Sequence, residues 1–173
     1  MSNIEISSLK LSPITLKRIS GEIKNFNKNK PDNITIYPNP DNILEIYFLI
    51  EGEKYSAFKD GEYICKLKHD PQYPLKAPDY YVLTPNGRFE INKKICLTNS
   101  AYHQNSWAPA AWNLLTLLNG FHSIWHSMDK EDKIGISHLR LCDEKIKSFA
   151  KNSVSFNNLE LSDLYFILKD KKI

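Results

Sequence analysis

The chain has few cysteines and few glycines, and their spacing matches no disulfide framework, metal site or phosphate-binding loop. Its three cysteines, Cys65, Cys96 and Cys142, form no C-x-x-C pair, and any disulfide would leave one thiol over. This pattern favours a reducing, intracellular compartment over a disulfide-stapled secreted domain. There is no Gly-rich phosphate loop, and the histidines and cysteines show no metal-ligand spacing. We therefore expect neither an organic cofactor nor a metal.

Arginine is also scarce, with three occurrences among the 23 basic residues, while lysine is spread along the whole sequence. The formal net charge of +3 is small. Proteins that bind nucleic acid usually concentrate their basic residues in a stripe interleaved with aromatic side chains. The diffuse surplus found in this sequence gives no indication of a nucleic-acid partner.

No Asp, Glu, Lys or Arg occurs from Ile95 to Met128, a stretch long enough to raise the question of a membrane span. A spanning helix needs about 20 predominantly apolar residues. Polar residues and a glycine interrupt the second half of the stretch: Asn113, Asn119, Gly120, His122, Ser123, His126 and Ser127. A buried helix accounts for it better, and the N-terminus lacks the layout of a secretory signal. We expect a soluble protein of the cytoplasm or the nucleus, without a transmembrane segment.

Length and composition favour one globular domain. A chain of 173 residues with 42% hydrophobic and 25% charged residues is close to an average soluble protein and can bury a core without staples. No repeat, low-complexity tract or linker divides it. We predict a single α+β domain over residues 1–173, with its core from about residue 10 to residue 168, and we expect a monomer.

The first half of the sequence predicts one helix followed by four strands. Ser12 is a suitable N-cap, and Pro13 suits the first helical position. Apolar residues then recur at helical spacing: Leu16, Ile19, Ile23 and Phe26. Four short runs rich in Ile, Tyr, Phe and Val follow, separated by turn residues: 33–40, 42–52, 61–70 and 79–85. Such a series is typical of an antiparallel meander.

The second half predicts an irregular segment and then three helices. Residues 91–109 show no clear periodicity, and a stretch that long without regular structure is usually functional. Residues 109–128 carry leucines and aromatic residues at core spacing, which predicts a central helix. Two further helices are expected, over residues 136–152 and within residues 159–170.

Cys96 lies in the irregular segment, where a reaction partner can reach a thiol. It follows Lys93 and Lys94, whose charges would favour the thiolate. Free cysteine is also a common small core residue, so position alone decides nothing. Cys65 alternates within a predicted strand and Cys142 falls within a predicted helix, so we expect both to be structural.

Ten residues before Cys96 stands Asn86, within the sequence Thr84-Pro85-Asn86-Gly87. An Asn amide beside a thioester carbonyl can donate a hydrogen bond to the oxyanion that forms when a nucleophile attacks. Pro-Asn-Gly is also a turn signal, and taken alone it favours a turn.

Four motifs stand in order in this region: Tyr-Pro-x-x-x-Pro at 73–78, Pro-Asn at 85–86, Cys-Leu at 96–97, and Trp-x-Pro-Ala at 107–110. In this combination they resemble the active-site region of ubiquitin-conjugating enzymes. The resemblance covers nearly the whole chain, most weakly after residue 129. It implies that family's fold: an N-terminal helix, a four-stranded antiparallel meander sheet, a long active-site loop and then C-terminal helices.

Most members of the family carry His-Pro-Asn, whereas this chain has Thr84 at the first position. The form is similar to a subgroup of tail-anchored enzymes associated with endoplasmic-reticulum protein degradation, in which a His-containing loop precedes the Trp signature. The resemblance suggests that His103 positions or deprotonates the incoming nucleophile, although a lone surface His is at least as often passive. The departure at Thr84 leads us to expect Ser or Thr hydroxyls as acceptors besides Lys. The chain stops without an apolar span, so we expect no membrane tail.

The resemblance also implies a reaction and its partners. An activating enzyme, which alone would use ATP, hands ubiquitin or a ubiquitin-like protein to Cys96 as a thioester, and Cys96 passes it to a substrate, usually with a ligase. The family pattern places partner contacts at five residues: Lys17 and Lys24 for the activating enzyme, and Leu75, Pro109 and Ala110 for the ligase. Each of these also fits an ordinary solvated helix or turn.

Two other functions compete with this reading. A catalytically silent ubiquitin-binding scaffold of the same fold would usually lack the cysteine, so Cys96 argues against it. A Cys/His hydrolase would pair Cys96 with His103, His122 or His126, but no hydrolase signature surrounds the cysteine.

Overall fold

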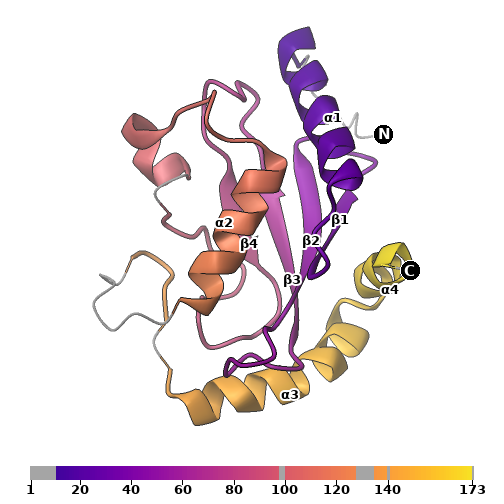
Figure 1. The fold of residues 1–173 in the computed structure, drawn as a ribbon, viewed down its shortest axis with the longest axis vertical. Coiled ribbons are helices and arrows are strands. Elements are labelled where there is room, and N and C mark those ends of the chain that lie inside the picture. The colour runs from indigo at the N-terminus through magenta and orange to yellow at the C-terminus, as the bar shows by residue number, and fades with distance from the viewer. Residues whose placement is uncertain (1–10, 98–99, 128–134, 140, 173) are drawn as a thin grey trace, which may run out of the picture.

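The computed structural model describes residues 11–97, 100–127, 135–139 and 141–172, which form a four-stranded sheet surrounded by helices (Figure 1). The described elements are, in chain order, α1 (Pro13–Lys28), β1 (Ile34–Pro38), β2 (Glu45–Glu51), β3 (Glu62–Lys68), β4 (Asp79–Val82), the 3₁₀ helix η1 (Ala101–Ser106), α2 (Leu114–His126), α3 (Asp143–Glu160) and α4 (Ser162–Lys172). This order confirms the predicted α+β fold, with one helix, a meander and then the later helices.

The helix α1 begins where the sequence predicts. The N–H of Thr15 donates to the Ser12 hydroxyl at 3.1 Å, and Pro13 occupies the first helical turn, where a missing N–H costs nothing. The buried residues of α1 are Thr15, Ile19, Glu22 and Phe26. The expected stripe is therefore confirmed at Ile19 and Phe26, and Ile23 is partly buried against the core.

Leu16, which was expected to lie in the apolar stripe of α1, is instead exposed. Glu22 takes an inward position, where its carboxylate accepts hydrogen bonds from the Tyr73 hydroxyl and from the N–H of Leu114. A buried carboxylate must be hydrogen-bonded to offset its lost hydration. These long-range donors, which the helical period does not reveal, allow a carboxylate to take an inward position on α1.

The four strands form one antiparallel sheet in the order β1-β2-β3-β4. The pairing aligns one buried residue from each strand in a row across the sheet: Ile36, Phe48, Cys65 and Val82. This row faces α2, whose Phe121 ring lies 5.8 Å from the ring of Phe48. Cys65 is thus a packing residue, as expected, and burial raises the pKa of its thiol.

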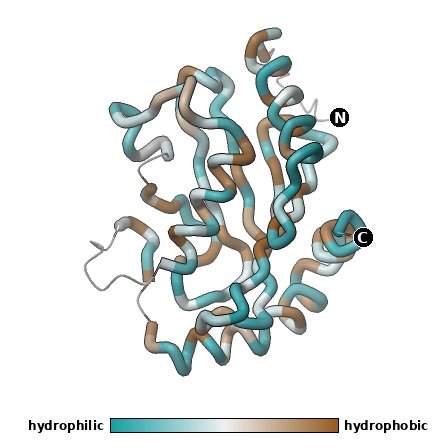
Figure 2. The backbone as a smooth tube through the Cα atoms, viewed as in Figure 1, coloured by the Kyte–Doolittle hydropathy of each residue, from teal (hydrophilic) through white to brown (hydrophobic). Residues whose placement is uncertain are grey.

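The main core lies between the sheet and α2. The helix contributes five residues that are fully buried: Leu114, Leu117, Leu118, Phe121 and Trp125. Burying side chains of this size stabilises the fold by about 1.5–3 kcal/mol each. Figure 2 shows hydrophobic residues concentrated along the strands that α2 crosses. No described helix is both long and apolar enough to cross a membrane.

The opposite face of the sheet carries a smaller apolar cluster. Leu49 and Ile64 on the sheet pack with Tyr165 and Leu168 of α4. Lys169 adds an ion pair with Glu62 at 2.8 Å. In Figure 1 α4 accordingly lies beside β1.

The helix α2 begins five residues later than predicted. Asn113 is its N-cap, and the Asn113 side chain and Thr116 form a reciprocal capping box. The preceding residues form a turn, in which the N–H of Ala111 donates to the carbonyl oxygen of Ala108 at 2.9 Å. The Arg18 guanidinium donates to the carbonyl oxygens of Pro109 and Trp112 at 2.8 and 2.7 Å and so holds this turn against α1. The sequence did not reveal this, since a proline is equally suited to start a helix. The predicted end near Met128 lies outside the described residues.

The helix predicted over 136–152 is also displaced. It begins at Asp143 with Cys142 as N-cap and continues to Glu160, and α4 ends two residues beyond the predicted limit of 170. Residues 135–139 instead run beside residues 88–90, with a bridge between Phe89 and His138. Cys142 is exposed, so the expectation that it is a structural residue within a helix is wrong.

Candidate active site

Cys96 and His103 form the contact on which the candidate site is centred. The Cys96 Sγ lies 3.0 Å from the His103 Nε2, and the site is open to solvent. His103 reaches the thiol because η1 folds the chain back after Cys96, whereas the sequence had predicted irregular structure there. The backbone at His103 is non-helical, with φ −123° and ψ 49°, and it marks a kink within η1. A thiol and an imidazole at this distance can exchange a proton.

The two lysines before the cysteine do not face it as free charges. Lys93 forms an ion pair with Glu90, and Lys94 forms one with Asp79 at 3.0 Å. Each ammonium charge therefore has a neighbouring carboxylate that compensates it. The thiolate-favouring field predicted from these two lysines is correspondingly weakened.

Asn86 is buried and uses its whole side chain within the turn of residues 84–89. Its Oδ1 accepts the N–H groups of Arg88 and Phe89, both at 2.7 Å. Its Nδ2 donates to the carbonyl oxygens of Thr84 and Phe89, at 3.0 and 3.1 Å. These four bonds give Asn86 the loop-supporting geometry. Donation to an oxyanion would require one of the two Nδ2 bonds to be exchanged.

Thr84 is fully buried and does not face the thiol. Its hydroxyl accepts the N–H of Ile64 at 2.9 Å and donates to the Asn157 Oδ1 at 2.7 Å. Asn157 in turn donates to the carbonyl oxygen of Glu62 at 2.8 Å. Thr84 therefore joins β3 and α3 to the start of the Pro-Asn turn. Because its side chain is fully buried, it cannot touch a substrate amine or hydroxyl directly.

Comparison with known proteins shows to which family the chain belongs. The profile of the family described as ubiquitin-conjugating enzyme matches residues 18–156, well over half of the sequence. The chain belongs to the ubiquitin-conjugating enzyme family. The predicted family is thereby confirmed, and the match includes Asn86, Cys96 and His103.

Individual relatives agree with this assignment. Ubiquitin-conjugating enzyme E2 6 of Saccharomyces cerevisiae is 37% identical over 144 residues, covering 83% of this chain and 56% of that protein. Ubiquitin-conjugating enzyme E2 34 of Arabidopsis thaliana is 34% identical over 142 residues, covering 82% of this chain and 58% of its own. The ubiquitin-conjugating enzyme E2 J2-like protein of Dictyostelium discoideum is 36% identical over 142 residues, covering 82% and 81%. The chain thus spans little more than half of the first two relatives.

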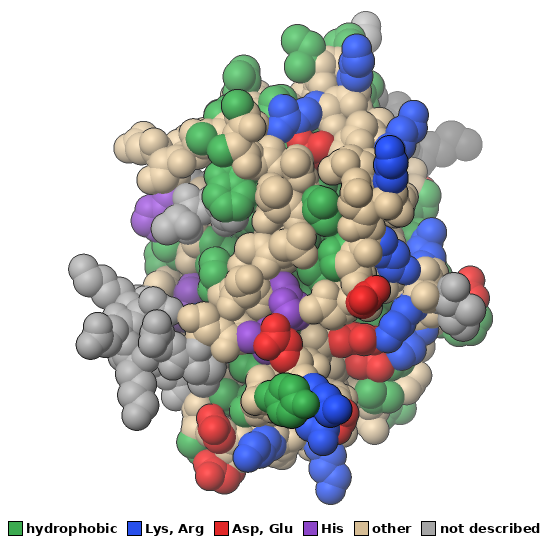
Figure 3. All heavy atoms as spheres, viewed as in Figure 1, with side chains coloured by type: hydrophobic (Ala, Val, Ile, Leu, Met, Phe, Trp, Pro, Cys, Tyr) green, Lys and Arg blue, Asp and Glu red, His purple; other side chains and the backbone are tan. Residues whose placement is uncertain are grey.

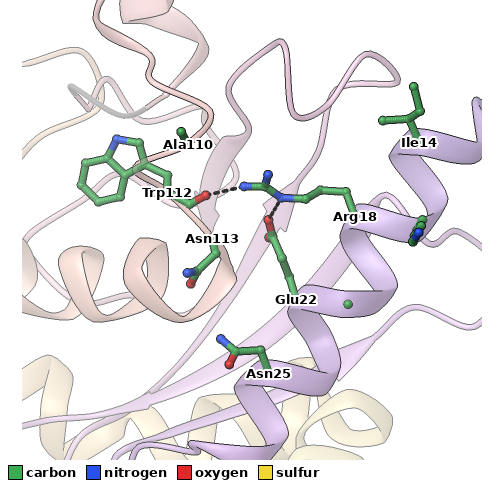
Figure 4. Close-up of a pocket in the computed structure, with 9 residues that line it drawn as sticks. Ile14, Arg18, Glu22, Asn25, Ala110, Trp112 and Asn113 are labelled. Carbon is green, nitrogen blue, oxygen red and sulfur yellow. Dashed lines mark hydrogen bonds and ion pairs between the residues drawn. The ribbon is translucent and has the colours of Figure 1, made fainter.

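A hollow of about 580 Å³ lies between α1 and the turn before α2 (Figure 4). Lys17 and Ala110 both line it, so the structure brings together one residue predicted to contact an activating enzyme and one predicted to contact a ligase. Lys24 is exposed on the same helix but does not line the hollow. Arg18 points across from α1 and holds the turn through the carbonyl oxygen of Trp112 (Figure 4). Figure 3 shows several Lys and Arg side chains along the α1 side of the molecule.

Leu75 lies on a neighbouring loop with its side chain 73% exposed. The Trp107 indole N–H donates to the carbonyl oxygen of Pro74 at 2.7 Å, which ties this loop to the Trp signature. Pro109 is half-buried next to that signature. The predicted ligase residues therefore border the same end of the molecule as the hollow.

A second polar cluster, which the sequence did not predict, lies at the C-terminal end of α2. One ligand-type atom each of Glu53, His122 and His126 lies within 4.8 Å of the other two. The two histidines are four residues apart on α2 and so share a face, a ligand spacing that the sequence analysis had overlooked.

The ring nitrogens of this cluster already have partners. The His126 Nε2 accepts the N–H of Glu53 at 3.0 Å, the His126 Nδ1 lies 2.9 Å from the carbonyl oxygen of His122, and the His122 Nε2 lies 2.8 Å from the Asn33 amide nitrogen. Burial is the main cause that lowers the pKa of His122. The cluster therefore fastens the end of α2 to the β2–β3 connection, and a metal ion would have to displace these bonds.

Proposed function

We propose that the protein is a ubiquitin-conjugating enzyme that carries ubiquitin, or a ubiquitin-like protein, as a thioester on Cys96. The observation that supports this proposal is the partly exposed Cys96 Sγ, 3.0 Å from the His103 Nε2, in a chain of this family. A thiol that solvent reaches and that has a base beside it can act as a nucleophile.

The reaction has two steps, and both break and form one acyl bond. The Cys96 thiolate attacks the thioester carbonyl on the activating enzyme, whose own thiolate leaves, and the modifier is now bound to Sγ. A substrate amine or hydroxyl then attacks the new carbonyl, the Cys96 thiolate leaves, and the attacking group loses its proton. The His103 Nε2 lies 3.0 Å from the Cys96 Sγ, and we expect His103 to take that proton.

The proposed partner surfaces come from the family resemblance, and two of their residues line the hollow beside α1. Lys17, and Lys24 farther along the helix, would contact the activating enzyme, while Leu75, Pro109 and Ala110 would contact a ligase. The hollow supports this assignment, because Lys17 and Ala110 line it together. In this proposal ATP is consumed by the activating enzyme and not by this chain.

The test is thioester formation from purified protein, ATP, ubiquitin and an activating enzyme. We expect an adduct that a reducing agent removes, and in Cys96→Ser an adduct that resists reduction and that hydroxylamine cleaves. Losing the covalent nucleophile abolishes the pathway rather than slowing it. Cys142→Ser is the matched control, because it removes the exposed thiol and should leave the adduct intact.

Two results would contradict the proposal. One is the absence of an adduct with ubiquitin and with every ubiquitin-like protein tried, which would favour a silent scaffold. The other is hydrolysis of a ubiquitin fusion without any transfer, which would favour a Cys/His hydrolase. Adding free lysine or N-acetylthreonine to the loaded enzyme then distinguishes amine from hydroxyl acceptors, because N-acetylthreonine has no free amine and its ester product is cleaved by hydroxylamine.

A further inference from the structure

The peptide groups on both sides of Cys96 are held by residues that follow it by 40 or more positions. The N–H of Cys96 donates to the carbonyl oxygen of Ile136 at 3.1 Å. The carbonyl oxygen of Cys96 lies 2.9 Å from the His138 Nε2. Both bonds come from residues 136–138, so this short segment fixes the direction of the main chain at the cysteine.

Arg88 determines which nitrogen of His138 carries the hydrogen. The Arg88 Nη1 lies 3.1 Å from the His138 Nδ1. A guanidinium is always protonated and has donors only, so the Nδ1 must accept. In the neutral ring the hydrogen is then on Nε2, where it donates to the carbonyl oxygen of Cys96.

The Arg88–His138 pair is itself fixed in place. The N–H of Glu90 donates to the carbonyl oxygen of Ser137, and the N–H of Leu139 donates to that of Arg88, at 2.9 and 2.8 Å. The Ser137 hydroxyl donates to the carbonyl oxygen of Lys94, also at 2.9 Å. The segment is therefore bound on one side to the chain after the Pro-Asn turn and on the other to the chain just before Cys96.

We propose that His138, oriented by Arg88, is a positioning residue that fixes the Cys96 peptide and thereby keeps the Cys96 thiol against His103. The inference rests on the proposed function, since it concerns the same thiol. In these contacts His138 bonds to the Cys96 carbonyl oxygen and not to Sγ, so it acts through the main chain. Without its donor the Cys96 carbonyl loses a hydrogen bond, and the peptide group keeps only the bond from the Leu97 N–H to the Ser100 hydroxyl, which loosens the position of the thiol.

The first test needs no ubiquitin. In a Cys142→Ser background, iodoacetamide modifies Cys96, since Cys65 is buried. We expect His138→Leu to lower the Cys96 alkylation rate about fivefold. We expect it also to accelerate exchange of the Leu97 amide hydrogen about tenfold, because that N–H shares a peptide group with the Cys96 carbonyl that His138 holds. His138→Gln should restore both rates, since its amide can donate to Cys96 and accept from Arg88. Ile136→Ala, an exposed side chain in the same segment, is the matched control.

A second measurement uses the unaltered chain and covers the case in which His138→Leu does not fold. NMR of the His138 ring nitrogens should show the hydrogen on Nε2 and a scalar coupling to the Cys96 carbonyl. A hydrogen on Nδ1 would overturn the inference. So would alkylation and exchange rates in folded His138→Leu that match those of Ile136→Ala.

The third test follows discharge of the loaded enzyme to free lysine. We expect His138→Leu to lower the maximal discharge rate about tenfold with little change in the lysine concentration at half-maximal rate, and His138→Gln to recover most of it. A substitution that merely destabilised the fold would not lower the maximal rate alone, and His138→Gln would not restore that rate. If the enzyme forms no thioester at all, the proposed function fails, while the alkylation, exchange and NMR results still decide the inference.

Discussion

The two sides of Cys96 differ in how many of their polar side-chain groups are already hydrogen-bonded within the protein. On the buried side, Asn86 uses every side-chain donor and acceptor within its turn, and the Arg88–His138 pair holds the Cys96 peptide. On the open side, His103 is exposed and meets the thiol directly. The difference separates two tasks: the buried side determines where the thiol lies, and the open side provides access and a base.

The open side is also joined to the proposed ligase-facing loop. The Gln104 amide of η1 donates to the carbonyl oxygen of Leu75 and accepts the N–H of Ala77, both at 3.0 Å. A partner that binds at Leu75 therefore contacts a loop that is hydrogen-bonded to Gln104, the residue after His103. On the buried side, the Asn86 side chain bonds within residues 84–89, and His138 bonds to Arg88 and Cys96. Because these bonds involve other residues than the Gln104 bonds, mutations can address the two sides separately.

The largest effect is expected on the buried side, at Asn86. Asn86→Ala leaves four buried backbone groups without their partner, each costing about 1–3 kcal/mol, so we expect unfolding free energy to fall by about 4 kcal/mol. Thioester discharge should fall about 10²-fold with it, as when an oxyanion donor is lost. Denaturant unfolding and single-turnover discharge measure the two effects.

Asn86→Asp separates the two roles of that side chain. It keeps the acceptor for the N–H groups of Arg88 and Phe89 but has no amide to donate to Thr84 or to an oxyanion. Stability recovered without discharge would support a role beyond the loop. Recovery of both would reduce Asn86 to loop support.

A smaller effect is expected on the open side, at His103. His103→Ala should slow discharge to amines about 30-fold, somewhat less than a typical general base because the site is open to water. Its unfolding free energy should change by less than about 0.5 kcal/mol, as for other exposed positions. Asn105→Ala, exposed in the same short helix, is the control for η1. Equal discharge rates in the two variants would show that His103 is passive.

The smallest effect is expected at His69, a buried histidine that contrasts with the exposed His103. Burial lowers the pKa of His69 to about 4 from 6.5, even though its ring bonds to the Leu44 carbonyl. Between these two values the unfolded chain binds more protons, so stability is complete above pH 6.5 and is lost as the pH falls toward 4. We expect a loss of about 1 kcal/mol from pH 7 to pH 5.5 from this group.

His69→Asn tests that contribution, because its amide can donate to Leu44 but does not titrate. The pH dependence of its unfolding should be flatter than that of the parent chain by about 1 kcal/mol over the same range. All carboxyl groups are common to both proteins and cancel in the difference. Parallel curves would mean that His69 is protonated without cost in the folded state.

Local sequence signals predicted much of the fold. Ser12 and Pro13 marked the start of α1, because a cap and a fixed φ act within one turn. The four strands follow the predicted runs, since alternation of side chains and turn residues is also local. The ordered motifs predicted the family, which the comparisons confirm. The catalytic roles of Cys96, Asn86 and His103 stay predictions until the experiments above are done.

What the sequence by itself determined about this protein is the order of its elements, its family and the choice of Cys96 as the residue to examine. Tertiary structure alone decided that Leu16 turns outward, that residues 136–139 are not part of the helix expected over 136–152, and that His138 meets Cys96. The physical reason is distance along the chain. Caps, turns and periodicity act over a few residues, whereas a hydrogen bond between His138 and Cys96 joins positions 42 apart and has no local signature.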